Sequence, residues 1–177
     1  HYCSNAHVAR SAPEDLLIYA LTPERVVKFA NDYGCHNIAF AVNEPTVALP
    51  TLLELSDVAR AAGLAVRALT NGYTQPEMTE RMGRAFDFVN VSIKGLETSF
   101  FAEHVGLPAT ADGASPFAVV LRNIATMHAL THVEVSTPIV QGVNDHEIPA
   151  IAAALGAIDR RIPWHVFRLL PEYKMAD

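Results

Sequence analysis

Polar residues able to do chemistry recur where apolar, β-branched segments of this sequence end. They are Asn43 and Glu44 after the first such segment, Thr70, Asn71 and Gly72 at the second, Ser92 and Lys94 at the third, Gln141, Asn144 and Asp145 beyond the fourth, and His165 and Arg168 within the fifth. A structural sheet has no need for a carboxylate, two amides and a lysine along one edge. Together these side chains predict one site for a polar ligand that carries both a basic and an acidic group.

The apolar segments themselves predict five strands, near residues 37–42, 65–70, 88–93, 133–138 and 164–169. Helical segments separate them. One begins at Thr22, which is suited to cap the helix, and continues with Pro23 and Glu24 in the first turn. Strands separated by helices run parallel with right-handed crossovers. Both an open doubly wound sheet and a partial barrel fit, and both gather function at the carboxyl ends of the strands.

Composition and charge narrow the functional classes. The 177 residues suit one domain, and the sequence is 50% apolar with a net charge of −6, so no basic surface suggests nucleic acid or an anionic membrane. No apolar run approaches the roughly 20 residues of a membrane-spanning helix. We expect a cytoplasmic protein. Its two cysteines, Cys3 and Cys35, are too few for a disulfide framework.

Five short motifs, in order, resemble the landmarks of radical S-adenosylmethionine (radical SAM) proteins. They are Asn43-Glu44-Pro45-Thr46-Val47, Thr70-Asn71-Gly72-Tyr73, Asn90-Val91-Ser92-Ile93-Lys94-Gly95, Pro163-Trp164-His165 and Pro171-Glu172-Tyr173-Lys174-Met175. The resemblance is to the branch of pyruvate formate-lyase activating enzyme, especially the type found with AMMECR and Memo proteins. It implies that residues 1–177 form a single radical SAM core domain, an α/β partial (β/α)6 barrel with parallel strands.

The family's defining motif, Cys-x-x-x-Cys-x-aromatic-Cys, holds a [4Fe–4S] cluster. His1-Tyr2-Cys3 resembles its end, which makes Cys3 the expected metal ligand and leaves two cysteines to lie before His1. We therefore expect a fragment that lacks the first barrel strand, also ends early, and is inactive alone. The unpaired apolar edge of the 37–42 strand would then favour dimerisation or aggregation. Cys35 is expected to pack in the core.

The same resemblance implies how S-adenosylmethionine (SAM) is bound. Glu44 stands where relatives end a Gly-Gly-Glu stretch whose acid receives the SAM ammonium, and Tyr2 and Asn43 count with it as cofactor-binding residues. Asn71 is expected at the ribose or carboxylate. From the residues alone, Glu44 and Asn71 also fit ordinary turns.

Four further residues complete the expected site. Ser92 and Lys94 match the family's Asp-x-Lys pattern, in which the acid faces the ribose and the lysine faces the SAM carboxylate; here serine replaces the acid. Val140 begins a glycine-containing turn that resembles the adenine cradle. His165 matches a histidine near SAM and is counted, with Cys3 and Lys94, among the catalytic residues. A solvated strand-end lysine and a merely hydrogen-bonded histidine remain alternatives.

One further departure and five unassigned side chains complete the pattern. Val42 stands where the branch usually has tyrosine. Five histidines fall on helices and loops without ligand spacing and are assigned no chemistry: His36, His104, His128, His132 and His146.

The resemblance implies an oxidoreductase-type enzyme. Complete, it would accept one electron from a flavodoxin or ferredoxin, cleave SAM to a deoxyadenosyl radical, and abstract hydrogen from a substrate. A glycine in a partner protein, as for activating enzymes, and a small molecule or peptide are equally open as that substrate. Two other classes remain open: a βα-barrel lyase or aldolase with Lys94 as a Schiff-base amine, and a degenerate nucleotide-binding module without iron.

Overall fold

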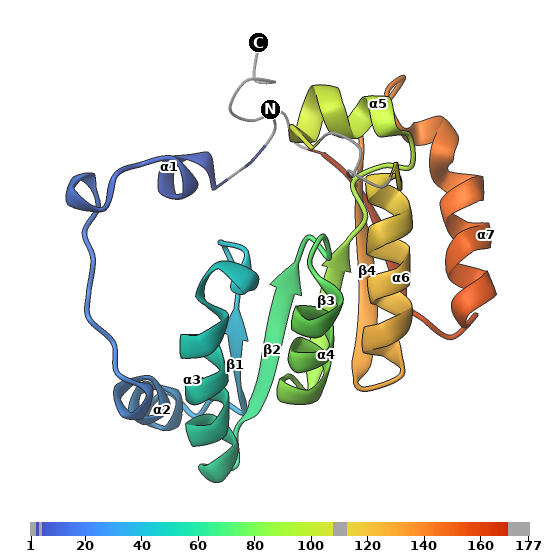
Figure 1. Cartoon of the computed structure of the whole chain (residues 1–177). Coiled ribbons are helices and arrows are strands. Elements are labelled where there is room, and N and C mark those ends of the chain that lie inside the picture. Colours follow the sequence, from blue (N-terminus) through green and yellow to red (C-terminus); the bar gives the residue numbers. More distant parts are fainter. Residues whose placement is uncertain (1–2, 4, 108–112, 170–177) are drawn as a thin grey trace.

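The centre of the molecule is one sheet of five parallel strands, each paired with the next along the chain. The computed structural model describes residue 3 and residues 5–107 and 113–169. Figure 1 shows the strands with their carboxyl ends at one end of the molecule. They are β1 (Asn37–Phe40), β2 (Ala65–Thr70), β3 (Phe88–Ser92), β4 (His132–Ile139) and β5 (Trp164–Arg168). The five predicted strands and their parallel direction are therefore confirmed.

Helices occupy every connection between these strands. The longer ones are α3 (Leu49–Ala61), α4 (Pro76–Ala85), α6 (Pro116–His128) and α7 (Ile148–Ile158), and a further helix, α2 (Pro23–Asp32), precedes β1. Short turns lie near the carboxyl ends of the strands or in the amino-terminal segment: α1 (Ala6–Ala9), η1 (Pro13–Asp15), η2 (Pro45–Ala48), α5 (Thr98–Phe100), the π-helical η3 (Phe101–Val105) and η4 (Asp145–Glu147). In Figure 1, α3, α4 and α6 lie in front of the sheet.

The core lies between this layer of helices and one face of the sheet. Alternate strand residues point into it, and six of them have at most 1% of their surface exposed: Val66, Ala68, Val89, Val91, Val133 and Val135. The opposite face carries polar side chains such as Arg67, Asn90 and Glu134, which are partly exposed. The period of two residues in a strand therefore separates an apolar, helix-covered face from a polar one.

Local sequence signals explain where the helices begin and end. The Thr22 hydroxyl accepts a hydrogen bond from the Arg25 N–H, and the Ser115 hydroxyl caps α6 in the same way. Proline follows each of these caps, in the first turn of its helix. Gly63, with a φ of 78°, follows α3 in the left-handed conformation that glycine adopts without strain.

Three local expectations differ from the structure. The strand predicted to reach Val42 ends at Phe40, because Val42 has a φ of 80° and leaves the extended region. The helix predicted near Glu97–His104 is instead α5 followed by the π-helical η3. Cys35 is exposed rather than packed in the core, because it lies in the turn between α2 and β1, where its N–H donates to the Ala30 carbonyl.

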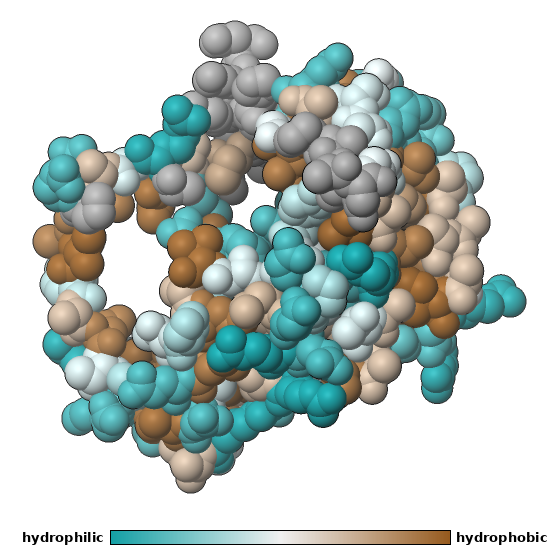
Figure 2. Space-filling model, in the orientation of Figure 1, coloured by the Kyte–Doolittle hydropathy of each residue, from teal (hydrophilic) through white to brown (hydrophobic). Residues whose placement is uncertain are grey.

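The edges of the sheet are β1 and β5 in the part of the chain that the structure describes. An extended strap connects η1 to α2 beside this sheet, and it exposes Leu17, Ile18, Tyr19 and Leu21. Figure 2 shows apolar side chains along the strap and an opening between it and the body of the molecule. Across the described ranges, no helix combines the length and apolar character needed to cross a membrane.

Candidate functional site

A cavity of about 470 Å³ opens at the carboxyl ends of the strands. This volume falls within the usual range of small-molecule sites. Loops after β1, β2 and β3 supply much of its wall, together with β5 and η3. Its polar lining residues are Cys3, Asn5, Asn43, Glu44, Thr70, Asn71, Tyr73, Ser92, Lys94 and His104.

Most of the site residues predicted from the sequence line this one cavity. Six of them do so: Cys3, Asn43, Glu44, Asn71, Ser92 and Lys94. The acid and the lysine predicted to hold the two ends of a zwitterion therefore share a cavity. Tyr2 lies outside the residues that the structure describes. Val140 and His165 are absent from the cavity wall.

Glu44 joins the loop after β1 to the end of β2. Its Oε1 accepts a hydrogen bond from the Thr70 hydroxyl at 2.6 Å and longer ones from the N–H and hydroxyl of Thr46. Its Oε2 accepts a hydrogen bond from the Asn71 N–H at 2.7 Å. Each carboxylate oxygen has two acceptor positions, so Oε2 keeps one for a ligand. The carboxylate thus binds the end of β2 and the loop after it, and it can still accept a hydrogen bond from a ligand.

The backbone of Val42, in the turn before Glu44, is strained. A positive φ of 80° is a rare conformation for a β-branched residue, and residues in such regions store about 1–3 kcal/mol of strain. Val42 lines the cavity two residues before Glu44. The strain therefore lies at the turn that brings Glu44 to the cavity.

A second rim turn, after β2, is fixed from two sides. The Asn71 Oδ1 accepts a hydrogen bond from the Tyr73 N–H at 2.8 Å. Asn123 of α6, 1% exposed, donates its amide hydrogens to the carbonyls of Gly72 and Thr74 at 2.8 and 2.9 Å. A Cβ at Gly72 would lie 2.6 Å from Val91, so this position requires glycine.

Ser92 belongs to a chain of hydrogen bonds on the polar face of the sheet. Its hydroxyl lies 3.3 Å from that of Ser136 in the neighbouring strand, and Ser136 donates to the Asn90 Oδ1 at 2.8 Å. In this position Ser92 offers a hydroxyl to the cavity but no charge.

Lys94 supplies the cation of the cavity. Within the described part of the chain its ammonium has no hydrogen-bond or ion-pair partner, although the side chain is partly buried. Burial lowers the pKa of the Lys94 ammonium, while Cys3 and Glu44 oppose that shift by favouring the charged form. A partly buried cation of this kind favours an anionic ligand.

The backbone of Lys94 is anchored by a buried amide. Asn144, completely buried, donates to the carbonyls of Lys94 and Pro138, both at 2.9 Å, and accepts from the Val140 N–H at 2.8 Å. One side chain therefore ties the loop after β3 to the end of β4. Val140 contacts Asn144 through its backbone and does not line the cavity.

His165 lies lower on the polar face of the sheet. Its Nε2 is 2.8 Å from the Glu134 carboxylate, and the ring is largely exposed. It pairs in register with Ser136, whereas Phe167 and Leu169, further along the chain, line the cavity. The structure therefore places His165 below the cavity instead of in its wall.

Sequence reasoning missed how several residues shape the site. Thr70 and Asn144 were expected among the polar residues at the strand ends, and Asn123 was not singled out. All three hold the rim through hydrogen bonds to partners distant in sequence, so no local pattern reveals these contacts. His104 lines the cavity from η3. Its position depends on the π-helical turn, which helix periodicity does not predict.

Comparison with known families gives one match over most of the chain. Residues 1–155 match the radical SAM superfamily. Among curated proteins, an uncharacterized protein of Methanocaldococcus jannaschii is 27% identical over 179 residues, covering 99% of this chain and 51% of its own length. The chain thus spans about half the length of that relative.

Solved structures share the fold at low sequence identity. A domain of pyruvate-formate lyase-activating enzyme from Bacteroides vulgatus has a TM-score of 0.57 at 17% identity, covering 78% of this chain and 81% of that one. SuiB from Streptococcus suis, bound to S-adenosylmethionine, has a TM-score of 0.66 at 13% identity, covering 89% of this chain and 36% of that one. Native anSMEcpe with bound AdoMet and a Cp18Cys peptide has a TM-score of 0.66 at 15% identity, covering 99% of this chain and 50% of that one. The predicted partial-barrel fold is confirmed.

Proposed function

Because this chain belongs to the radical SAM superfamily, we propose that the cavity at the carboxyl ends of its strands binds S-adenosylmethionine. Members of this superfamily are enzymes that use a [4Fe–4S] cluster together with SAM. One observation carries the proposal: Glu44 and Lys94, an acid and a base distant in sequence, line the same cavity as Cys3. When bound and given one electron, SAM would break into methionine and a deoxyadenosyl radical able to abstract hydrogen from a substrate.

The donor set fits the two ends of SAM. Lys94 is proposed to bind the carboxylate, because it is the lysine in the wall and has no partner among the described residues. Glu44 is proposed to receive the ammonium through the acceptor position that Oε2 keeps. Ser92 and Asn71 border the same cavity and are proposed to contact the ribose.

The fit to the cluster is incomplete in this sequence. The family motif uses three thiolates, and the sequence contains two cysteines. Cys3 lines the cavity, whereas Cys35 precedes β1 and so belongs to the opposite end of the strands. These residues can hold one corner of a cluster, at Cys3.

We further propose a peptide or protein substrate and a flavodoxin or ferredoxin as electron donor. Support for the peptide comes from two relatives of the fold: SuiB has been solved with the precursor peptide SuiA, and anSMEcpe with a Cp18Cys peptide. A glycine in a partner protein is the substrate suggested by the resemblance to activating enzymes.

The decisive experiment supplies the two missing thiolates. The chain is fused behind a segment that completes Cys-x-x-x-Cys-x-aromatic-Cys at Cys3, reconstituted anaerobically with iron and sulfide, and titrated with SAM. We expect a brown protein that absorbs near about 400 nm, binds SAM, and releases 5′-deoxyadenosine on reduction. In Lys94→Ala, SAM affinity should fall at least about tenfold, equivalent to one lost ionic contact of about 1.4 kcal/mol.

The matched control is Lys28→Ala, which removes an exposed lysine from α2. Its SAM affinity should equal that of the parent chain. A brown protein that binds no SAM, or a Lys94→Ala variant that binds it normally, contradicts the proposal. A colourless protein that still binds SAM supports the iron-free nucleotide-binding module instead.

A further inference from the structure

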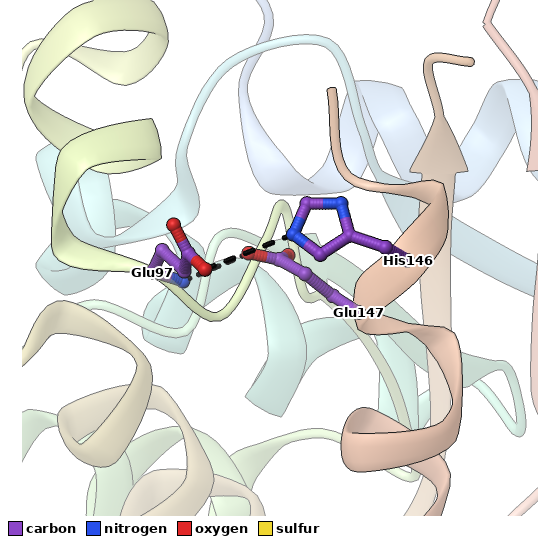
Figure 3. Close-up of side chains that lie close together, drawn as sticks. All are labelled: Glu97, His146 and Glu147. Carbon is purple, nitrogen blue, oxygen red and sulfur yellow. Dashed lines mark hydrogen bonds and ion pairs between the residues drawn. The ribbon is translucent and has the colours of Figure 1, made fainter. Parts of the chain in front are cut away.

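A second group of ligating side chains lies beside the SAM cavity, and the function proposed above does not use it. Glu97 follows β3, and His146 and Glu147 lie in η4, ahead of α7. One ligand atom from each residue lies within 4.8 Å of the other two. Figure 3 shows the three side chains converging, with the Glu97 carboxylate 3.7 Å from the His146 Nε2. We propose that these three residues bind a divalent first-row metal ion.

Glu147 is already oriented for such a role. It is 4% exposed, and its two carboxylate oxygens accept hydrogen bonds from the N–H groups of Leu96 at 2.7 Å and Glu97 at 3.0 Å. Each oxygen keeps a second acceptor position. Metal-binding carboxylates are commonly fixed by hydrogen bonds of this kind. The buried ligand is therefore rigid, while Glu97 and His146 are exposed and free to close on an ion.

The three side chains lie beside a second cavity with an acidic lining. A separate cavity of about 270 Å³ is lined by Glu97, Glu103 and Glu147, and by His104. Among the residues that the structure describes, no lysine or arginine lines it. Closing the three ligand atoms onto bonds of about 2.1 Å requires separations of about 3.4 Å in a tetrahedral site. The 3.7 Å between Glu97 and His146 is already close to that value.

The donor types select the class of ion. One imidazole with two carboxylates suits Mn²⁺, Fe²⁺ or Zn²⁺, whereas no thiolate contributes to this group. An ion here would hold Glu97 and Glu147 together and thereby fix the loop that begins at Lys94. His104 lines both cavities, so the two sites share a wall. The metal is thus expected to stiffen one side of the SAM cavity without entering it.

The test uses Mn²⁺ and the chain as it stands. Mn²⁺ prefers oxygen and nitrogen ligands, so neither cysteine should compete for it. After removal of metals with a chelator, binding is followed by loss of the electron paramagnetic resonance signal of free Mn²⁺. We expect one ion per chain, displacement by Zn²⁺, and slower hydrogen exchange at the Leu96 and Glu97 amides.

Two variants of exposed ligands decide the outcome without disturbing the core. His146→Ala and Glu97→Gln should each weaken Mn²⁺ binding at least about tenfold, whereas His132→Ala, which removes an exposed histidine next to another glutamate, should leave it unchanged. The proposal is overturned if Mn²⁺ fails to bind below about 1 mM, or if His146→Ala and Glu97→Gln bind it as the parent chain does. Equal losses in the His132→Ala control would also overturn it.

Discussion

Replacing Thr70 with valine tests the clasp that holds Glu44 at the rim. Valine has almost the shape of threonine but lacks its hydroxyl. In the structure that hydroxyl is buried, donates to the Glu44 Oε1 at 2.6 Å and accepts from the Gly72 N–H at 3.1 Å. The substitution therefore removes two hydrogen bonds and leaves the buried Gly72 N–H without this acceptor and the partly buried Glu44 carboxylate without this donor.

The magnitude follows from the two bonds. A hydrogen bond to a charged group contributes about 1.5–3 kcal/mol, and a buried N–H without an acceptor costs about 1 kcal/mol or more. Thr70→Val should therefore destabilise the protein by about 3 kcal/mol. Thr70→Ser keeps the hydroxyl and loses one methyl group, which costs about 1 kcal/mol. The two variants should therefore differ by about 2 kcal/mol, which is the loss of the hydroxyl less the loss of the methyl group.

Urea denaturation of both variants and the parent chain measures this difference. With a slope near 2 kcal/mol per molar, the unfolding midpoint should fall by about 1.5 M in Thr70→Val and by about 0.5 M in Thr70→Ser. If both variants lose the same stability, the hydroxyl does not hold Glu44 and the clasp is wrongly described.

Three further outcomes are expected. Val42→Gly should raise the unfolding free energy by about 1 kcal/mol in the same assay, because glycine relieves the positive φ and little apolar surface is lost; a destabilised variant would contradict the strain. Gly72→Ala should lower the free energy of unfolding by about 2–4 kcal/mol, because the new Cβ would meet Val91 at a residue with positive φ. Gly34 has a similar φ but open space around it, so Gly34→Ala should lower that free energy by only about 1 kcal/mol. Equal losses in the two variants would refute the close approach at Gly72. Hydrogen bonds from Arg161 and then His128 hold the pKa of Asp159 well below its usual range, so the stability that this group contributes is complete above pH of about 4 and is lost as the pH falls below it. Asp159→Asn should therefore reduce the dependence of the unfolding free energy on pH in acid. An unchanged dependence in this variant would count against the pairing.

The strands and most helices were predictable because their signals are local. Alternation of apolar residues, the Thr22 cap and the Gly63 stop each act within a few residues. The shared cavity was also predictable, because parallel strands bring their carboxyl ends to one edge and Glu44 and Lys94 both follow strands.

The remaining features depend on partners that only the fold brings together. The Asn123 side chain meets the carbonyl of Gly72, 51 residues away, and Asn144 meets that of Lys94, 50 residues away. His146 was assigned no chemistry because Glu97 is its neighbour only in space. His165 follows a family pattern, yet its ring pairs with Glu134 on the adjacent strand. Sequence spacing carries no information about such contacts.

The order of the sheet affects how the molecule can be assembled. Since β1 to β5 pair strictly in sequence, no strand must be inserted between two that have already joined. Growth from β1 to β5 can thus follow synthesis on the ribosome, where earlier segments fold first. A nascent chain that has completed β2 already possesses the Thr70 partner of Glu44, and the basic side of the pocket appears one βα unit later. A partly synthesised chain therefore contains the acidic Glu44 before the basic Lys94 that faces the same cavity.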